Sequence, residues 1–444
     1  MQRSAAAGSN SLAKEVGREP LEFRLMASKA APRPLRGVRV LDCATMIAGP
    51  LCATQLGDYG AEIVKLEQPG KGDPARHFGA EKHGEGIYWK TLSRNKASVA
   101  LDLHKTEAQQ IFRRWLGTFD ILIENFRPGT LERWNLDPNE LLAQHPRLIV
   151  LRMTAFGQQG PYRDRAGFGT LAEAMTGIAA VTGWEDRPPL LPPFALADTM
   201  AAMLATSAVL AAYLRARDSG EGEIIDCAIY EAAMKLTELH MMDYDQTRHV
   251  AIRKGNELEF TAPRGAFACS DGLWVALSGS SQSIAERFIH AIGGDELAKD
   301  PRFKTNTDRI KNGDALNRAI EAWCKVRTRP DVLDTLIPLG CAIGPLETIQ
   351  TIFDNPQIQF RESYVTVEDP TFGALRMMRA QPEFLRSEPA TLVPGPSEVG
   401  ADTARLLKRD LGLSDAEIQA LRGQSVIPSV APQARSRGTE TIIA

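Results

Sequence analysis

One carboxylate stands out among the residues that could carry chemistry. Asp198 lies in the stretch PPFALADTMAAMLATSAVLAAYL, residues 192–214, at the start of a long apolar run that predicts a helix. An aspartate at this point can accept hydrogen bonds from the backbone N–H groups of the first helical turn, which have no partner inside the helix. The segment by itself favours a helix N-cap, and it leaves open a chemical role for the same carboxylate.

Other common centres of chemistry are missing from the sequence. The six cysteines show neither CxxC nor Cys/His spacing, so we expect reduced packing residues and no bound metal. The absence of a GxGxxG or P-loop motif gives little support for a dinucleotide or another tightly bound cofactor. His77, His83 and His104 fall in or near predicted loops, and we expect them to have no carboxylate or metal-like partner.

The composition is that of an ordinary soluble globular protein. With 24% charged residues, 43% hydrophobic residues and a net charge of -3, the 444-residue chain gives no electrostatic reason to expect a nucleic-acid partner. The longest apolar run, residues 200–214, is too short to cross a bilayer unaided and is followed by Arg215 and Arg217. We therefore expect a buried helix, no membrane partner and, from the cysteine usage, a cytoplasmic location.

Five short β-branched stretches alternate with helical ones in the first part of the chain. Continuous apolar strands separated by helices predict a parallel sheet covered on both faces, which is the α/β class. The first loop places Pro50 at the first position of a helix and Gly60 at its C-terminal cap. The predicted strands are VRVLDCA (38–44), AEIVKLE (61–67), SVALDL (98–103), ILIENF (121–126) and LIVLRMT (148–154).

A change of pattern after Tyr213 indicates a second, smaller α/β domain. The strand IIDCAIY leads into a polar, Met-rich stretch that we interpret as a linker. The next strand pair, GAFACSDGLWVALSG, turns on Asp271 and Gly272. The last predicted helix begins at Ser414 with a capping sequence that ends on Glu417.

Six segments, in their order and spacing, are similar to those of one enzyme family, the class III CoA-transferases, which includes formyl-CoA:oxalate CoA-transferase and carnitine CoA-transferase. The resemblance covers about residues 36–424 and implies a homodimer of two interlocked ring-like subunits, each with a Rossmann-like large domain and a smaller α/β domain. The six segments are LRGVRVLDCATMIAGPLCATQLGDYGAEIVKLEQPGKGDPAR, SRNKASVALDL, DILIENFRPGTLERWNL, FGQQGPYRDRAGFG, FALADTM and CAIGPLETI.

By this analogy both ends of the chain build the large, CoA-binding domain. The expected parts are a disordered extension (1–35), the first segment of the large domain (36–228), a linker (229–255), the small domain (256–347), a return segment completing the large domain (348–424) and a flexible tail (425–444).

The resemblance implies that Asp198 is the nucleophile of a CoA-transferase. In this chemistry the carboxylate attacks an acyl-CoA thioester to give a mixed anhydride, and CoA thiolate then forms an aspartyl-CoA thioester. An acceptor carboxylic acid runs the cycle in reverse, so that CoA and acyl-CoA are substrates. The partial positive charge of a helix N-terminus would keep Asp198 ionised at neutral pH, and nearby N–H groups could stabilise an oxyanion.

The resemblance also implies where CoA binds. Gln68 departs from the family pattern, because the formyl-CoA enzyme has an arginine at this point, and Arg94, Lys96 or Lys71 could replace that phosphate contact. The matched positions are Ile47 and Ala48 beside the pantetheine, Leu101, Asn125 and Phe126 near the nucleotide, and Arg133 at a phosphate.

Two other functions stay open at this point. The α-methylacyl-CoA racemases share the fold and place a proton-carrying histidine where this chain has Phe168, which cannot carry a proton. Gly169, next to it, stands where many relatives carry an acid. Together with Gln68, this glycine keeps open a CoA-binding protein without catalysis.

The acyl groups are expected to be those of small dicarboxylates. The segments FGTLAEAMTG and APRGAFACSDGLWVALSGSSQSIAERF resemble family branches that handle succinate, mesaconate or malate. Basic residues near the expected domain junction could hold a distal carboxylate at two points, namely Arg248, Arg253, Lys254 and Arg264.

Overall fold

The computed structural model describes residues 30–429, which form two compact units. Residues 30–152, 205–225 and 365–429 form the first unit, and residues 153–204 and 226–364 form the second. Both ends of the described chain thus belong to the first unit. Most of the expected extension (1–35) and tail (425–444) lies outside the described residues, and the predicted domain boundaries stay a proposal.

A six-stranded sheet forms the centre of the first unit, in the order β5-β2-β1-β6-β7-β8. β1, β2, β5, β6 and β7 are paired in parallel, as their apolar sequences predict. Each of the five predicted strands is present. The bounds are β1 Arg39–Asp42, β2 Glu62–Glu67, β5 Lys96–Ala100, β6 Ile121–Glu124, β7 Ile149–Thr154 and β8 Glu223–Ala228.

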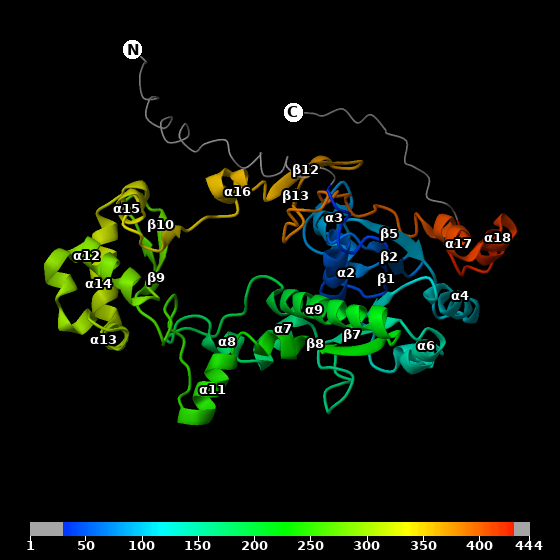
Figure 1. Cartoon of the computed structure of the whole chain (residues 1–444), viewed down its shortest axis with the longest axis horizontal. Helices are drawn as coiled ribbons and strands as arrows, with labels where there is room; N and C mark the ends of the chain where they lie inside the picture. The colour runs from blue at the N-terminus through cyan, green and yellow to red at the C-terminus, as the bar shows by residue number, and fades with distance from the viewer. Residues whose placement is uncertain (1–29, 430–444) are drawn as a thin grey trace, which may run out of the picture. The chain divides into compact units, whose positions relative to one another are not determined.

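The helices of the first unit bury a large apolar core against this sheet. The cluster joins strand residues such as Leu41 and Val99 to Phe112 and Trp115 of α4 and to Leu406 of α17. The C-terminal helices, red in Figure 1, lie beside α4, and α17 also contacts β5. The bounds are α2 Ala48–Asp58, α3 Ile87–Leu92, α4 Thr106–Leu116, α5 Thr130–Arg133, α6 Pro138–Gln144, α17 Thr403–Leu411 and α18 Asp415–Gly423, with a hairpin of β12 Tyr364–Asp369 and β13 Gly373–Met378.

Two of the three helix ends predicted in the first unit are confirmed by the structure. Ser414 and Glu417 form the predicted capping box at the start of α18. Gly60 follows the C-cap of α2 with a φ of 108°, a left-handed conformation that favours glycine. The prediction for Pro50 is wrong, because α2 begins two residues earlier, with Ile47 as the N-cap and Ala48 as the first helical residue.

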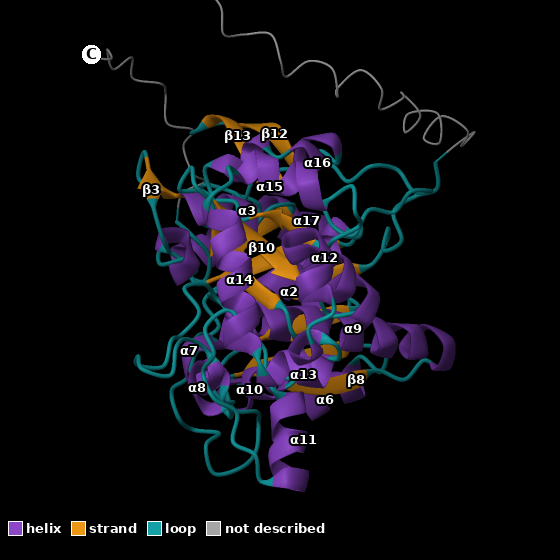
Figure 2. Cartoon of the chain, turned by 90° about the vertical axis from the view of Figure 1, so that its left-hand side faces the viewer, coloured by secondary structure: helices purple, strands orange, loops and turns teal. Residues whose placement is uncertain are grey.

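The second unit contains a small antiparallel sheet with its own core. β9 and β10 form the predicted hairpin, in which Gly272 has a φ of 76°. Helices α12 and α14 pack together (Figure 2). Their apolar residues join those of the sheet in one cluster. The bounds are β9 Arg264–Ala268, β10 Trp274–Ser278, β11 Ile343–Pro345, α12 Gln282–Ala298, α13 Asn306–Lys311, α14 Gly313–Lys325, α15 Arg329–Leu336 and α16 Pro356–Phe360.

Four further helices belong to the second unit, two before Asp198 in the chain and two after it. α7 packs against α8 and α10. The stretch 229–255, which was expected to be a linker, contains two complete helices, α10 and α11. The bounds are α7 Gly169–Met175, α8 Ile178–Val181, α10 Ile229–Met234 and α11 Glu238–Thr247.

Helix α9 (Leu196–Ser219) contains Asp198 and is less buried than expected. Only 33% of its most apolar window is buried, and Met203, Leu204 and Leu214 are about half exposed. The expectation of a buried helix is therefore wrong for the single chain, because apolar residues lie on all sides of α9 and one chain covers only some of them. By length and composition alone α9 could also cross a membrane, a property that it shares with core helices of soluble proteins.

Candidate active site

Asp198 lies in the first turn of α9, but it is not the helix cap. The helix begins at Leu196, and the backbone N–H of Ala197 donates to Glu173 Oε1 at 3.1 Å. Glu173 comes from α7 and thus supplies the acceptor that the sequence assigned to Asp198. Among the described residues no hydrogen bond reaches the Asp198 carboxylate. The N-cap prediction is wrong, and the partly buried carboxylate is left available for chemistry.

A missing side chain makes room for this carboxylate. A Cβ atom on Gly169 would lie 2.5 Å from Asp198 Oδ2 and 2.9 Å from its Cγ, well inside contact distance. The φ of Gly169 lies outside the left-handed region, so its backbone alone does not require glycine. The space beside Asp198 is therefore what the glycine provides.

Burial changes the acidity of Asp198. Desolvation, with a smaller contribution from the charge of Glu173, raises the pKa of Asp198 to about 6. Burial and Glu173 thus act against the helix N-terminus, which was expected to keep Asp198 ionised at neutral pH. Asp198 is still mainly ionised at pH 7 and above, and a carboxylate with a raised pKa is a stronger base and nucleophile.

The residues matched to CoA binding lie in the first unit, at one edge of its sheet. Ile47 and Ala48 follow β1, Leu101 follows β5, and Asn125 and Phe126 follow β6. Because these strands are parallel, their carboxyl ends meet at the same edge, where open α/β sheets bind ligands. The structure therefore brings these five residues to the same edge of the sheet, at the carboxyl ends of its strands.

A buried ion network shapes the loop that precedes α2. Lys65 Nζ lies 2.9 Å from Asp73 and 3.7 Å from Asp42, and also donates to the carbonyl of Ala44. Asp73 accepts the N–H of Met46 at 3.0 Å, and Met46 has a left-handed φ of 66°. Burial opposes ionisation of Asp73, but Lys65 and the backbone donors outweigh it and lower its pKa. The network fixes the backbone just before Ile47, and the sequence motifs alone did not show it.

Asn125 and Phe126 have structural partners at this edge. The side-chain amide of Asn125 accepts the N–H of Thr45 and donates to the Thr45 carbonyl, each at 2.8 Å. The ring of Phe126 meets Trp134 edge to face, with centroids 5.2 Å apart. The amide of Asn125 thus joins two loops, and its contact with a ligand would have to use other atoms.

Arg133 is a surface residue that forms no ion pair with a carboxylate of the described residues. It is exposed on α5, and its Nη2 donates to Thr130 Oγ1 at 2.9 Å. Trp134, next to it, also contacts the ring of His104, with centroids 5.1 Å apart. This group of aromatic rings was not predicted, because its members come from separate loops and His104 lies 30 positions before Trp134.

Two of the three suggested replacements for a contact at Gln68 are engaged elsewhere. Lys96 is buried and contacts Asp42 at 2.9 Å. Arg94 donates to Asp58 through two nitrogens, at 2.9 and 2.5 Å. Both suggestions are wrong for this structure, because each cation is already neutralised inside the first unit, whereas Lys71 is exposed.

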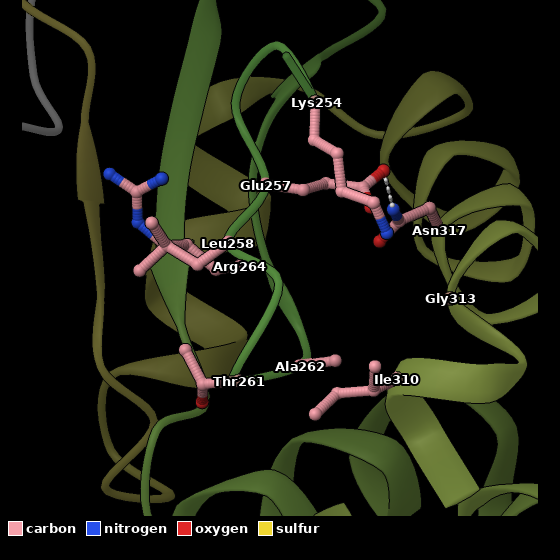
Figure 3. A pocket seen from close by; sticks show the side chains of 9 residues that line it. All are labelled: Lys254, Glu257, Leu258, Thr261, Ala262, Arg264, Ile310, Gly313 and Asn317. Carbon is pink, nitrogen blue, oxygen red and sulfur yellow. Dashed lines mark hydrogen bonds between the residues drawn. The ribbon is translucent and has the colours of Figure 1, made fainter. Parts of the chain in front are cut away.

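The four basic residues proposed for the acceptor do not form one group. Arg248 is exposed at the C-terminus of α11, and Arg253 donates to four backbone carbonyls of residues 180–187. Lys254 and Arg264 line two adjoining cavities, the larger of about 360 Å³. In the smaller one, Lys254 extends toward Glu257 and Asn317 while the Arg264 guanidinium points away (Figure 3). Of the four, Lys254 and Arg264 thus line a cavity in which an acceptor could bind.

Histidine and cysteine residues offer no comparable centre. His77 and His104 contact Glu81 and Asp102, at 2.9 and 3.0 Å, so the expectation that they lack carboxylate partners is wrong. Both pairs are solvent-exposed. All six cysteine side chains are buried, as expected. In residues 30–429, no cluster of three His, Cys, Asp or Glu side chains could hold a metal ion.

Comparison with known proteins shows the family. The model of CoA-transferase family III matches residues 35–403. Succinyl-CoA--D-citramalate CoA-transferase of Chloroflexus aurantiacus is 37% identical over 403 residues, covering 90% of this chain and 100% of that protein. The beta subunit of its succinyl-CoA--L-malate CoA-transferase is 36% identical, over 89% of this chain and 98% of that protein.

A solved structure agrees with the mixed α/β fold and its parallel sheet. A CAIB/BAIF family protein from Brucella suis is 29% identical, with a TM-score of 0.74, covering 86% of this chain and 100% of that one. This chain therefore belongs to CoA-transferase family III. Enzymes of this family act on CoA thioesters.

Proposed function

We propose that this enzyme transfers CoA from an acyl-CoA to a small dicarboxylic acid through covalent intermediates on Asp198. The observation that carries the proposal is the Asp198 carboxylate itself. It is partly buried at the start of α9, free of hydrogen bonds from the described residues and given space by Gly169. Such a carboxylate is desolvated enough to attack a thioester and open enough to accept an acyl group.

The proposed reaction balances with the two substrates alone. An Asp198 oxygen attacks the thioester carbonyl, the C–S bond breaks and CoA leaves as a thiolate, which gives a mixed anhydride. The thiolate then attacks the Asp198 carbonyl of the anhydride, forming aspartyl-CoA and releasing the first carboxylate. The acceptor carboxylate attacks this thioester, and the returning thiolate takes the acceptor acyl group. Asp198 is regenerated as a carboxylate.

The CoA molecule is proposed to bind at the carboxyl edge of the first unit's sheet. The backbone at Ile47 and Ala48 would face the pantetheine, since the Lys65–Asp73 ion pair fixes the loop before them. Leu101, Asn125 and Phe126 would lie near the nucleotide, and the exposed guanidinium of Arg133 is free to pair with a phosphate. The large domain carrying this edge is proposed to be Rossmann-like.

A small dicarboxylate is the proposed acceptor because the relatives named for citramalate and malate are among the most similar. Initial rates with succinyl-CoA should be highest for four- and five-carbon dicarboxylates and low for palmitate. Arg264→Ala should raise the KM of the dicarboxylate about tenfold by removing a charge-assisted contact. Arg302→Ala, which removes an exposed arginine of the same unit, is the control. Faster turnover of palmitate than of any dicarboxylate would refute this specificity.

A racemase is the weaker alternative. Phe168 stands where the racemase mechanism needs a proton-carrying histidine, and its exposed phenyl ring has no acidic or basic group. Incubation of an α-methylacyl-CoA in deuterated water would report α-proton exchange if the racemase assignment were right. We expect none.

A homodimer is part of the proposal. α11 has no buried residue, and Leu239, Met241, Met242 and Tyr244 of this helix are at least 37% exposed. The exposed apolar side chains of α9 add to this surface, and exposed apolar surface of this kind marks interaction sites. The family resemblance implies two interlocked subunits, and we propose that the second copy of the chain covers these surfaces.

Sedimentation velocity of the chain expressed alone should give twice the mass of 48.6 kDa. A stable, active monomer would contradict the homodimer. Activity that appears only after a second, different subunit is added would also contradict it. A cytoplasmic location completes the proposal, and recovery of the protein in the membrane fraction would speak against it.

A further inference from the structure

Glu173 has a position that the reaction described above does not use. Its side chain is only 2% exposed, although a buried carboxylate is costly unless it is bonded. It lies on α7 four residues after Gly169, so both positions share one face of that helix. Gly169 contacts Asp198 on this face, and Glu173 accepts the N–H of Ala197, the residue before Asp198.

Glu173 is also the charged group that acts on Asp198 among the described residues. α10 packs against α7, but its Glu231 is exposed and pairs with the hydroxyl of Tyr230 at 3.2 Å. The acid at 173 therefore has two separable properties at the start of α9. It is a hydrogen-bond acceptor, and it is a negative charge.

We propose that Glu173 is a positioning residue of this active site, which accepts the first-turn N–H of α9 in place of Asp198 and holds a negative charge beside the Asp198 carboxylate. The inference rests on the proposed function of Asp198 as nucleophile. By satisfying the helix terminus, Glu173 removes the reason for Asp198 to fold back onto its own backbone. By its charge, it makes the Asp198 carboxylate more basic and a better nucleophile once ionised.

Two variants separate these properties. Glu173→Gln keeps an oxygen that can accept the Ala197 N–H but removes the charge, whereas Glu173→Ala removes both. Wild type and both variants are mixed with succinyl-CoA between pH 5 and 8 and quenched with hydroxylamine at fixed times. Peptide mass spectrometry then gives the rate of hydroxamate formation at position 198, and thermal unfolding reports on the fold.

The wild-type rate should fall as the pH drops through about 6, where Asp198 becomes protonated. In Glu173→Gln this acid limb should move to lower pH, and the rate above pH 7.5 should fall by about 3- to 10-fold because the carboxylate is less nucleophilic. Glu173→Ala should show the same shift, with a further loss of rate at every pH and a lower Tm from the lost cap.

An acid limb that stays in place in Glu173→Gln overturns the electrostatic part of the inference. Equal rates and equal Tm values for the Gln and Ala variants overturn the capping part. Absence of hydroxamate at position 198 in the wild type would instead overturn the proposed function, and this inference with it. The two failures are therefore distinguishable.

Discussion

Asp198→Asn should lower CoA transfer at least ~10³-fold while leaving acyl-CoA binding in place. The amide neither attacks a thioester nor forms an anhydride, but it keeps the size and shape of the carboxylate. Exchange of labelled succinate into succinyl-CoA measures turnover, and calorimetric titration measures binding. Asp218→Asn, at the exposed far end of α9, is the matched control and should retain wild-type rates. Deamidation at position 198 must be excluded by mass spectrometry, and a fully active variant would then contradict the nucleophile.

The same variant should be more stable than the wild type, which distinguishes a nucleophile from a cap. The folded-state pKa of Asp198, about 6, lies above its ordinary value of 3.8, so ionisation opposes folding. This cost is absent below the unfolded-state pKa and fully present above the folded-state pKa. At pH 8 the amide should therefore add about 1–2 kcal/mol to the free energy of unfolding, and the gain should shrink as the pH falls through 6. Loss of a cap would instead cost about 1 kcal/mol.

Gly169→Ala should reduce turnover about 10²-fold with little change in stability. The added Cβ would meet Oδ2 and Cγ of Asp198, and a carboxylate at the end of a flexible side chain can move away at small cost. Displacement of a nucleophile by about 1 Å is enough for a loss of this size. Steady-state kinetics should show the loss in kcat, with a nearly unchanged KM for acyl-CoA.

Gly423→Ala is the control for this glycine, because a Cβ there meets nothing within 4 Å and the backbone is unstrained. It should leave kcat and Tm unchanged. Wild-type activity in Gly169→Ala would show that the space beside Asp198 has no role in the reaction.

Local patterns in the sequence predicted much of the fold. The five parallel strands, the turn at Gly272 and the capping box at Ser414 depend on residues within a few positions of each other. The helix start near Asp198 was also predicted, whereas Ile47 and Asn125 were assigned to CoA binding only by resemblance. Such features need only hydrophobic periodicity, turn residues and the direction of parallel strands.

The errors at the site come from partners that are distant in sequence. Asp198 was interpreted as the helix cap because the true acceptor, Glu173, lies on another helix, 25 positions before Asp198. The only sequence signal for Glu173 is its spacing of four residues from Gly169, which puts both on one face of a helix. Lys96 was interpreted as a possible phosphate ligand because its ion-pair partner, Asp42, lies on another strand and is not evident from the local sequence. The exposure of α9 could not follow from its own apolar sequence, since burial depends on what covers the helix.

The most direct test is to look for the covalent intermediate on the enzyme. Wild-type protein is incubated with succinyl-CoA and no acceptor, quenched with hydroxylamine or borohydride, digested and analysed by mass spectrometry. The account predicts a hydroxamate or a reduced side chain at position 198, absent from Asp198→Asn and formed on the timescale of turnover. An enzyme that exchanges CoA rapidly yet carries no modification at Asp198, or carries it at another residue, would contradict the mechanism.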